Sequence, residues 1–186
     1  MRKTILRLMI LGLPVLGPAS AGEVVDRIVA VVGKEIITLS ELQEYRKGAA
    51  KEPLEGLIRE RLFAAEMERL GISASDDDLA DALRQVLSRN RMTPEQLRSE
   101  LSRKGTSFDR YKAELRQEIR RYKFLGQVIV PRIRVSEEEI AKEAGPNATE
   151  EARLIARQKI VESRLTGELE SYLDEVRHKT YVEIKK

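Results

Sequence analysis

The sequence predicts a mostly α-helical protein, a helical bundle with a small β-sheet formed by strands from the two ends of the mature chain. Residues 24–32 form a β-branched run near the start, and residues 180–184 alternate like a half-buried strand at the end. Between them, helix-capping signals and apolar residues at helical spacing recur. A lone hairpin is marginal in water, so we expect the terminal strand to pair with the first strands.

The first residues are typical of a cleaved secretory signal. Arg2, Lys3 and Arg7 form a positive start, a short apolar run follows, and an Ala-Ser-Ala pattern ends at Ala21. The apolar run is shorter than the roughly 20 residues that a spanning helix needs. We therefore expect residues 1–21 to be a signal peptide cut between Ala21 and Gly22, with the mature protein in the periplasm.

Charge and composition exclude several classes of protein. Of the 34 Lys and Arg residues, three leave with the signal, and the remaining 31 equal the 31 Asp and Glu residues. A neutral mature chain does not support binding to nucleic acid. The absence of cysteine excludes disulfides and thiolate sites. No other apolar run is long enough to span a bilayer, so we expect a mature protein that is not embedded in a membrane.

The first elements follow in order. The strand over residues 24–32 turns at Gly33 and returns over residues 35–38. A short helix follows and ends near Gly48. The next helix begins at Pro53, where a missing N–H costs little, and keeps apolar residues at helical spacing as far as Leu70, before a terminating glycine.

Capping residues mark the next three helices. Ser75 precedes three aspartates, whose carboxylates favour the positive end of a helix. Thr93 begins a Thr-Pro-Glu-Gln capping box, and the short helix after it stops at Gly105. Ser107 caps a longer helix that we expect to end at Pro131.

The last part of the chain is expected to return to the domain formed by residues 22–135. Residues 136–148 make a short connection, with a capping box at Ser136 and a break at Gly-Pro-Asn. Residues 149–186 form a long helix, with Leu154 on its apolar face, and a closing strand.

Alternation places two aliphatic residues of the closing strand on one face. Val182 and Ile184 should therefore face the core, with Tyr181 and Glu183 opposite. Exchange of these terminal arms between two copies would give a homodimer, and the sequence leaves the oligomeric state open.

Several local sequences resemble the SurA family of periplasmic chaperones. The resemblance covers nearly all of residues 23–140 and 150–186, and it implies a helical chaperone domain completed by a C-terminal helix and strand. The segments that carry it are residues 25–32, 36–42, 70–73, 90–98, 101–105, 108–116, 172–173 and 181–184.

The sequence departs from this family at one place. Family members insert one or two parvulin-type prolyl isomerase domains before the closing helix. Here about 14 residues separate Val135 from Thr149, whereas a small domain usually needs about 50. The resemblance therefore implies a chaperone domain without the isomerase.

Signals of enzymatic chemistry are few. His178 is the only histidine, and it lies in the last turn of a predicted helix, where a cation offsets the helix dipole. Without cysteine or a second histidine, neither a common triad nor a histidine-based metal site is available. We expect no catalytic, cofactor-binding or metal-binding residue and no cofactor.

The leading hypothesis is an ATP-independent holdase that binds unfolded or extended polypeptides. By resemblance, its clients would be outer-membrane protein precursors. Candidate client-binding residues are apolar and lie at helix ends or on the short helix that has few anchors. They are Met67, Met92, Leu97, Leu101, Phe108 and Tyr111.

Two other functions remain open at this point. A periplasmic scaffold would bind one fixed partner, or a second copy, through the same surface. A prolyl isomerase is the third choice.

Cleavage of the signal gives the first prediction. The secreted protein should have the intact mass of a chain that begins at or near Gly22, because the small residues before it suit signal peptidase. Mass spectrometry of the periplasmic fraction measures this. A soluble product that retains residues 1–21 would contradict it.

Overall fold

A computed structural model describes residues 26–48 and 52–185 of the chain. The predicted signal peptide, with its cleavage point between Ala21 and Gly22, lies outside the described residues. So do residues 24 and 25 of the predicted first strand. None of the helices within the described ranges has the length and apolar character that crossing a bilayer would require.

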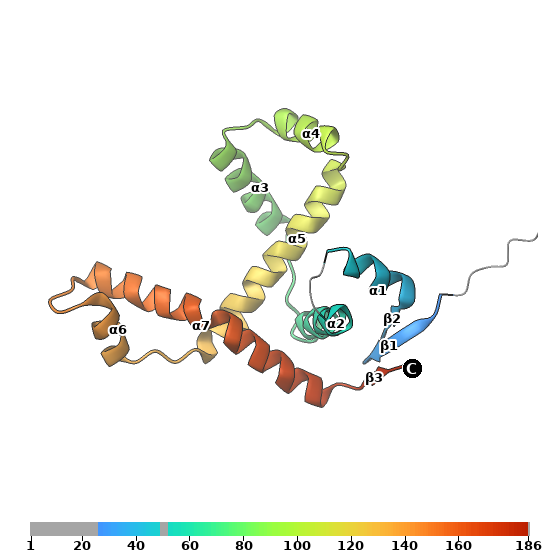
Figure 1. Cartoon of the computed structure of the whole chain (residues 1–186). Helices are drawn as coiled ribbons and strands as arrows, with labels where there is room; N and C mark the ends of the chain where they lie inside the picture. The colour runs from blue at the N-terminus through green and yellow to red at the C-terminus, as the bar shows by residue number, and fades with distance from the viewer. Residues whose placement is uncertain (1–25, 49–51, 186) are drawn as a thin grey trace, which may run out of the picture.

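The two ends of the described chain meet in one small antiparallel sheet (Figure 1). Its strands are β1 (Ile28–Val32), β2 (Glu35–Thr38) and β3 (Val182–Ile184), in the order β2-β1-β3. Val32 is paired with Glu35 on one side and with Val182 on the other. The predicted pairing of the terminal strand with the first hairpin is confirmed.

One face of the sheet packs on the helices. Ala30 and Ile37 are completely buried on this face and belong to the first core, together with residues of α1 and α2. Val182 is half-buried against the same core, as predicted. The prediction is wrong for Ile184, which is 48% exposed. It lies at the far end of an edge strand, whereas Val182 lies next to the end of the helix that leads into β3.

Helices α1 (Leu39–Arg46) and α2 (Pro53–Arg69) cover this sheet. Thr38 and Glu41 form a capping box at the start of α1. The two helices approach closely where a Cβ on Gly56 would lie 2.7 Å from the hydroxyl oxygen of Tyr45. Any larger residue at position 56 would have to displace the tyrosine ring.

A separate lobe consists of α3 (Asp76–Asn90), α4 (Pro94–Arg103) and the first part of α5 (Phe108–Phe124) (Figure 1). The predicted caps Ser75, Thr93 and Ser107 each accept a hydrogen bond from a backbone N–H in the first turn. The fifth helix was expected to run to Pro131. Instead its regular α-helical part ends at Phe124, and a wider turn follows.

That wider turn is a π-helical segment, η1 (Leu125–Ile129), and it continues into a 3₁₀ turn, η2 (Val130–Arg132). The chain therefore stays helical as far as Pro131, but it changes from an α-helix to a π-helix and then to a 3₁₀-helix. Phe124 and Ile129, at the two ends of this change, are both completely buried.

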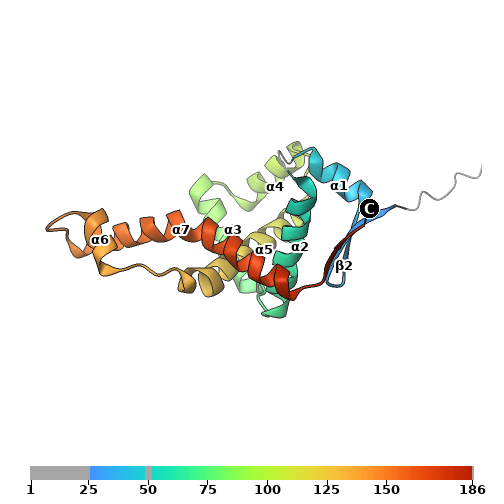
Figure 2. The same ribbon diagram turned by 60° about the horizontal axis from the view of Figure 1, so that its bottom comes forward.

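The last helices form an arm that projects from the body (Figure 2). Helix α6 (Glu137–Ala144) lies along the first part of α7 (Glu150–Lys179), so residues 136–148 contain a helix and a turn. Leu154, expected on the apolar face of α7, is 61% exposed, as is Ile155. In this part α7 packs mainly on the short α6, which leaves much of its surface uncovered.

Acidic residues of α6 face basic residues of α7 in this arm. Three ion pairs join them: Glu137–Arg153, Glu143–Lys159 and Glu139–Arg164. Arg164, together with the backbone N–H of Ser136, lowers the pKa of Glu139 to about 2. Between the charges, Ile140 is 4% exposed and is the main apolar anchor of α6.

A second core joins α2, the end of α5 and α7. Its buried residues are Phe63, Met67, Ile72, Phe124, Ile129 and Leu173. The ring of Phe124 makes edge-to-face contacts with Phe63, at 4.8 Å between centroids, and with Tyr172, at 5.7 Å. This core holds α7 against the body before the chain returns to the sheet. The succession of helices between the terminal strands confirms the predicted mostly helical fold.

A buried carboxylate lies at the border of this second core. Glu66 is 5% exposed, and Arg69 donates two hydrogen bonds of 2.7 Å to its carboxylate. Tyr172 of α7 donates a third from its hydroxyl group. The hydrogen bond from Arg69, assisted by that from Tyr172, lowers the pKa of Glu66 although burial opposes this.

Glu66→Gln should lower the free energy of unfolding by about 1–2 kcal/mol at pH 7, since it removes charge-assisted hydrogen bonds. A folded-state pKa below the ordinary 4.5 means that this stabilisation is present above pH 4.5 and is lost as the pH falls through the folded value. Urea unfolding at pH 7 and near pH 3 measures it, with the exposed Glu68→Gln as control. An equal deficit at both pH values would contradict the prediction.

The two aliphatic residues of β3 should respond differently to a charge. Val182→Asp should destabilise the protein by about 2 kcal/mol, because it removes a half-buried aliphatic contact and places a carboxylate against the first core. Ile184→Asp, at a site that is 48% exposed, should cost much less. Thermal melts of both variants test this, and equal losses would show that the two positions are covered alike.

Candidate functional site

A small apolar pocket opens between α2, the junction of α5 with η1, and α7. Its volume is about 160 Å³. The four apolar residues that line it are Phe63, Leu125, Leu169 and Leu173, and the four charged ones are Arg59, Glu60, Arg121 and Glu170. The pocket therefore has an apolar lining and charged groups from two helices and the end of a third.

Two of the apolar residues are buried core residues, and the other two are half-buried beside them. Phe63 and Leu173 belong to the second core and are 7% and 6% exposed. Leu125 and Leu169 are half-buried and pack on the outside of that core. Leu125 is also the first residue of the π-helical turn, a type of segment that is frequent at functional sites.

The charged residues are held by defined contacts. Arg59 of α2 pairs with Glu170 of α7 across 2.9 Å. The guanidinium carbon of Arg121 lies 5.2 Å from the centroid of the Phe63 ring, a cation–π distance. Arg59 and Glu170 thus pair with each other at the pocket, and Arg121 lies against one of its apolar residues.

The size of the pocket limits what it can hold. An apolar cavity of about 150 Å³ in a protein core is known to accept benzene. A pocket of about 160 Å³ therefore matches one aromatic ring or one branched aliphatic side chain. Charged and hydrogen-bonding groups around it could contact the flanking polypeptide.

The predicted client-binding residues lie elsewhere. Met67 is 3% exposed within the second core and does not line the pocket. The other five lie in the lobe of α3, α4 and α5. There Leu97 is 8% exposed, and the remaining four are half-buried: Met92, Leu101, Phe108 and Tyr111. The structure thus gathers five of the six in one lobe, and their role in client binding stays a prediction.

Phe108 shows why this lobe is a less favourable apolar site. Arg98 and Lys112 lie 4.8 Å and 5.3 Å from the centroid of its ring. Two cations thus lie at this ring, whereas Arg121 is the single cation at the ring of Phe63 among the described residues. The ring therefore contributes to a small local cluster capped by charge.

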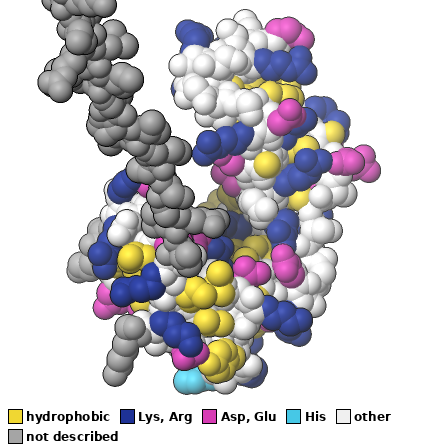
Figure 3. All heavy atoms as spheres, turned by 90° about the vertical axis from the view of Figure 1, so that its right-hand side faces the viewer, with side chains coloured by type: hydrophobic (Ala, Val, Ile, Leu, Met, Phe, Trp, Pro, Cys, Tyr) yellow, Lys and Arg dark blue, Asp and Glu magenta, His cyan; other side chains and the backbone are white. Residues whose placement is uncertain are grey.

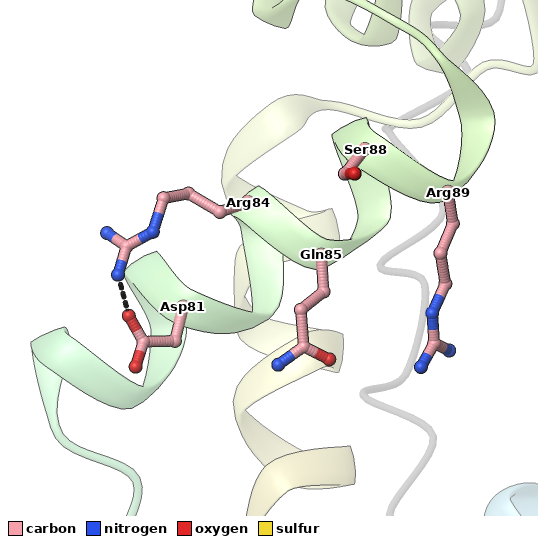
Figure 4. A pocket seen from close by; sticks show the side chains of 5 residues that line it. All are labelled: Asp81, Arg84, Gln85, Ser88 and Arg89. Atoms are coloured by element: carbon pink, nitrogen blue, oxygen red, sulfur yellow. Dashed lines mark hydrogen bonds and ion pairs between the residues drawn. The ribbon is translucent and has the colours of Figure 1, made fainter.

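Two larger hollows lie on or beside the same lobe. One of about 480 Å³ lies on α3 and is shown in Figure 4, where Asp81 and Arg84 pair with each other. Gln85, Ser88 and Arg89 complete its lining. Its neighbour, of about 490 Å³, lies between α3 and α5 beside Tyr122, which is 77% exposed. The first hollow offers only polar and charged side chains, whereas the second also presents Val86, Leu115 and Ile119 among its charged residues.

No direct signal for the apolar pocket is present in the sequence. Leu169 and Leu173 lie four residues apart, at helical spacing, but such a stripe does not distinguish a core from a pocket. Leu125 lies in a π-helical turn, and Arg121 comes from one helix to cover a ring of another. A hint was available in the apolar cluster of residues 124–130, which is too long for the single buried face of a regular helix.

No group of histidine and carboxylate side chains in the described ranges has a metal-binding arrangement. His178, the only histidine of the sequence, lies exposed in the last turn of α7, at the place predicted for it, and is the cyan side chain in Figure 3.

The sequence is similar to known chaperones. Two relatives named Chaperone SurA are 35% identical over 133 residues (Bordetella avium) and 33% identical over 149 residues (Pseudomonas fluorescens). The first match covers 62% of this chain and 26% of the relative, and the second 70% and 35%. This chain thus spans about a quarter to a third of the length of these relatives.

A solved structure shows the same fold. It belongs to the study of PEB4 and Cj1289, described as two structurally related SurA-like chaperones in Campylobacter jejuni. The superposition has a TM-score of 0.69 at 16% identity and covers 86% of this chain and 99% of the other. At that identity the likeness concerns the fold alone.

The sequence model of the SurA N-terminal domain matches residues 25–124, more than half of the chain. These residues include the hairpin, both helices that cover the sheet, and the lobe up to the end of α5. The chain therefore belongs to the SurA N-terminal domain family.

Proposed function

We propose that this protein is a periplasmic chaperone that holds unfolded segments of exported polypeptides without ATP. The observation that carries the proposal is the apolar pocket, whose volume suits one aromatic side chain and at which Arg59 and Glu170 pair with each other. Family membership and the names of the relatives support it.

The energy of such a contact explains why no ATP is needed. Burying one large apolar side chain contributes about 1.5–3 kcal/mol. This is less than the roughly 4 kcal/mol of a millimolar complex. One side chain in the pocket is therefore held weakly and released by thermal motion, and a client stays bound only through several such contacts along its length.

The clients that we propose are precursors of outer-membrane β-barrels. These chains alternate apolar and polar residues and carry girdles of aromatic side chains, which are ligands of the right size for the pocket. Kept apart from one another, their strands cannot pair edge to edge and aggregate.

We propose that the protein acts by binding and not as a prolyl isomerase. In the continuous described stretch 52–185, the chain passes from η2 through α6 directly into α7. This direct passage supports a chaperone module with no isomerase domain inserted before the closing helix.

Leu169→Gln should weaken the suppression of aggregation about tenfold, because it places an amide in the apolar lining and removes a contact worth about 1.4 kcal/mol or more. The measurement is light scattering of a diluted, unfolded β-barrel precursor at increasing concentrations of mature protein. Leu125→Gln, at another apolar residue of the lining, should have a similar effect.

The matched control is Ile155→Gln, which makes the same kind of change at a position that is 61% exposed and outside the pocket. It should suppress aggregation as well as the parent. Thermal melts confirm that the variants are folded. Failure of the parent to reduce scattering at excess would refute the chaperone proposal, and equal activity of all variants would refute the pocket.

A further inference from the structure

The outer edge of β3 leaves backbone groups without a strand partner among the described residues. The sheet order β2-β1-β3 gives β3 a neighbour on one side only. The N–H of Gly33 donates to the carbonyl of Tyr181 at 2.7 Å, and the N–H of Lys185 donates to the carbonyl of Val29 at 2.9 Å. Since the backbone groups of successive strand residues point to opposite sides, those of Val182 and Ile184 point away from β1.

The side chains of this edge differ between its two faces. Val182 and Ile184 lie on the face turned toward the first core, and Ile184 is 48% exposed there. Tyr181 and Glu183 lie on the other face, where the tyrosine is 62% exposed and Glu183 pairs with Lys185 at 2.7 Å. One side of an added strand would thus meet aliphatic groups and the other side polar ones.

The other edge of the sheet is less suitable. At β2 the backbone N–H of Thr38 lies 3.5 Å from a carboxylate oxygen of Glu41 in the capping box, and α1 begins at the next residue. Fewer backbone groups of β2 are therefore free to pair with an added strand.

We propose that an extended segment of a client docks on the outer edge of β3 as a fourth, transient strand. The inference rests on the proposed chaperone function and adds a binding mode and a client pattern to it. Backbone donors and acceptors in alternation are matched by another extended backbone and not by a helix. The two unlike faces select a strand with alternating apolar and polar residues, which is the pattern of a membrane β-barrel strand.

A client fits this edge better than a second copy does. In the antiparallel register that overlaps both β3 strands fully, Glu183 would face Glu183 of the second copy, and like charges directly opposite destabilise a strand pair. The edge is only three residues long and ends beside Lys185. A short edge with a terminal lysine resists permanent pairing, so an added strand stays exchangeable.

The test uses the mature protein and a fluorescein-labelled peptide with the alternating sequence of a β-barrel strand. Ile184→Pro removes an N–H that points away from β1, so the native sheet tolerates it while an added strand loses a donor and meets the proline ring. The control Ile184→Ala removes the same side chain but keeps the N–H. Fluorescence polarisation should show at least about tenfold weaker binding for the proline variant than for the alanine variant.

Hydrogen exchange supplies a second readout on the unmodified protein. The amides of Val182 and Ile184 should exchange more slowly when the peptide is bound. A peptide N-methylated at alternate amides should neither bind as tightly nor give this protection.

Equal affinity of the proline and alanine variants, or peptide binding without protection of these two amides, would overturn the docking site. Suppression of aggregation by the parent would then still support the chaperone function. A dimer that forms without peptide and is lost in Ile184→Pro, seen by sedimentation velocity, would assign the edge to a second copy and also overturn the proposal. If the parent neither binds the peptide nor suppresses aggregation, the proposed function itself is refuted.

Discussion

The arrangement of this molecule depends on the burial of one aromatic ring. Phe124 is completely buried, and the planes of its two aromatic neighbours are inclined to its own by 77° for Phe63 and 71° for Tyr172. These three rings come from α5, α2 and α7. Edge-to-face contacts have a preferred direction, so they fix the angles at which the helices meet as well as their proximity. The path of α7, and with it the projecting arm and the return to the sheet, follows from this contact.

The candidate site shares its framework with that contact. Phe63 touches Phe124 within the core, lies near the guanidinium of Arg121, and also lines the pocket. A binding surface built on core side chains keeps its shape when it is empty, which lowers the entropy lost on binding. The lobe and the arm carry fewer buried residues, and local opening should begin there. A preformed pocket on a firm core and two softer projections would suit the proposed binding of polypeptides of different lengths.

Local sequence signals predicted most of the elements. The caps at Ser75, Thr93 and Ser136 use side chains within three residues of the helix start, so their geometry is encoded in a few letters. The pairing of the terminal strand followed from the marginal stability of a lone hairpin. The exposure of Leu154 and Ile184 was not predictable, because apolar spacing defines a face but not whether another element reaches it. The pocket depends on where α7 crosses α2, which is a property of the whole chain.

The π-helical turn has a consequence for the length of the chain. Residues five apart on a regular α-helix point about 140° away from each other. In η1 the same spacing leaves Phe124 and Ile129 both completely buried in one core. The turn thus accommodates one residue more than a regular helix would need. Gly126 and Gln127 are exposed within it, and no atom beyond the glycine's chain neighbours and local helix backbone approaches the Cβ position of Gly126 within 4 Å. Related chains that lack one residue here can therefore keep the same pair of buried side chains on an ordinary α-helix, and alignments across this family should place a gap at this point rather than in a loop.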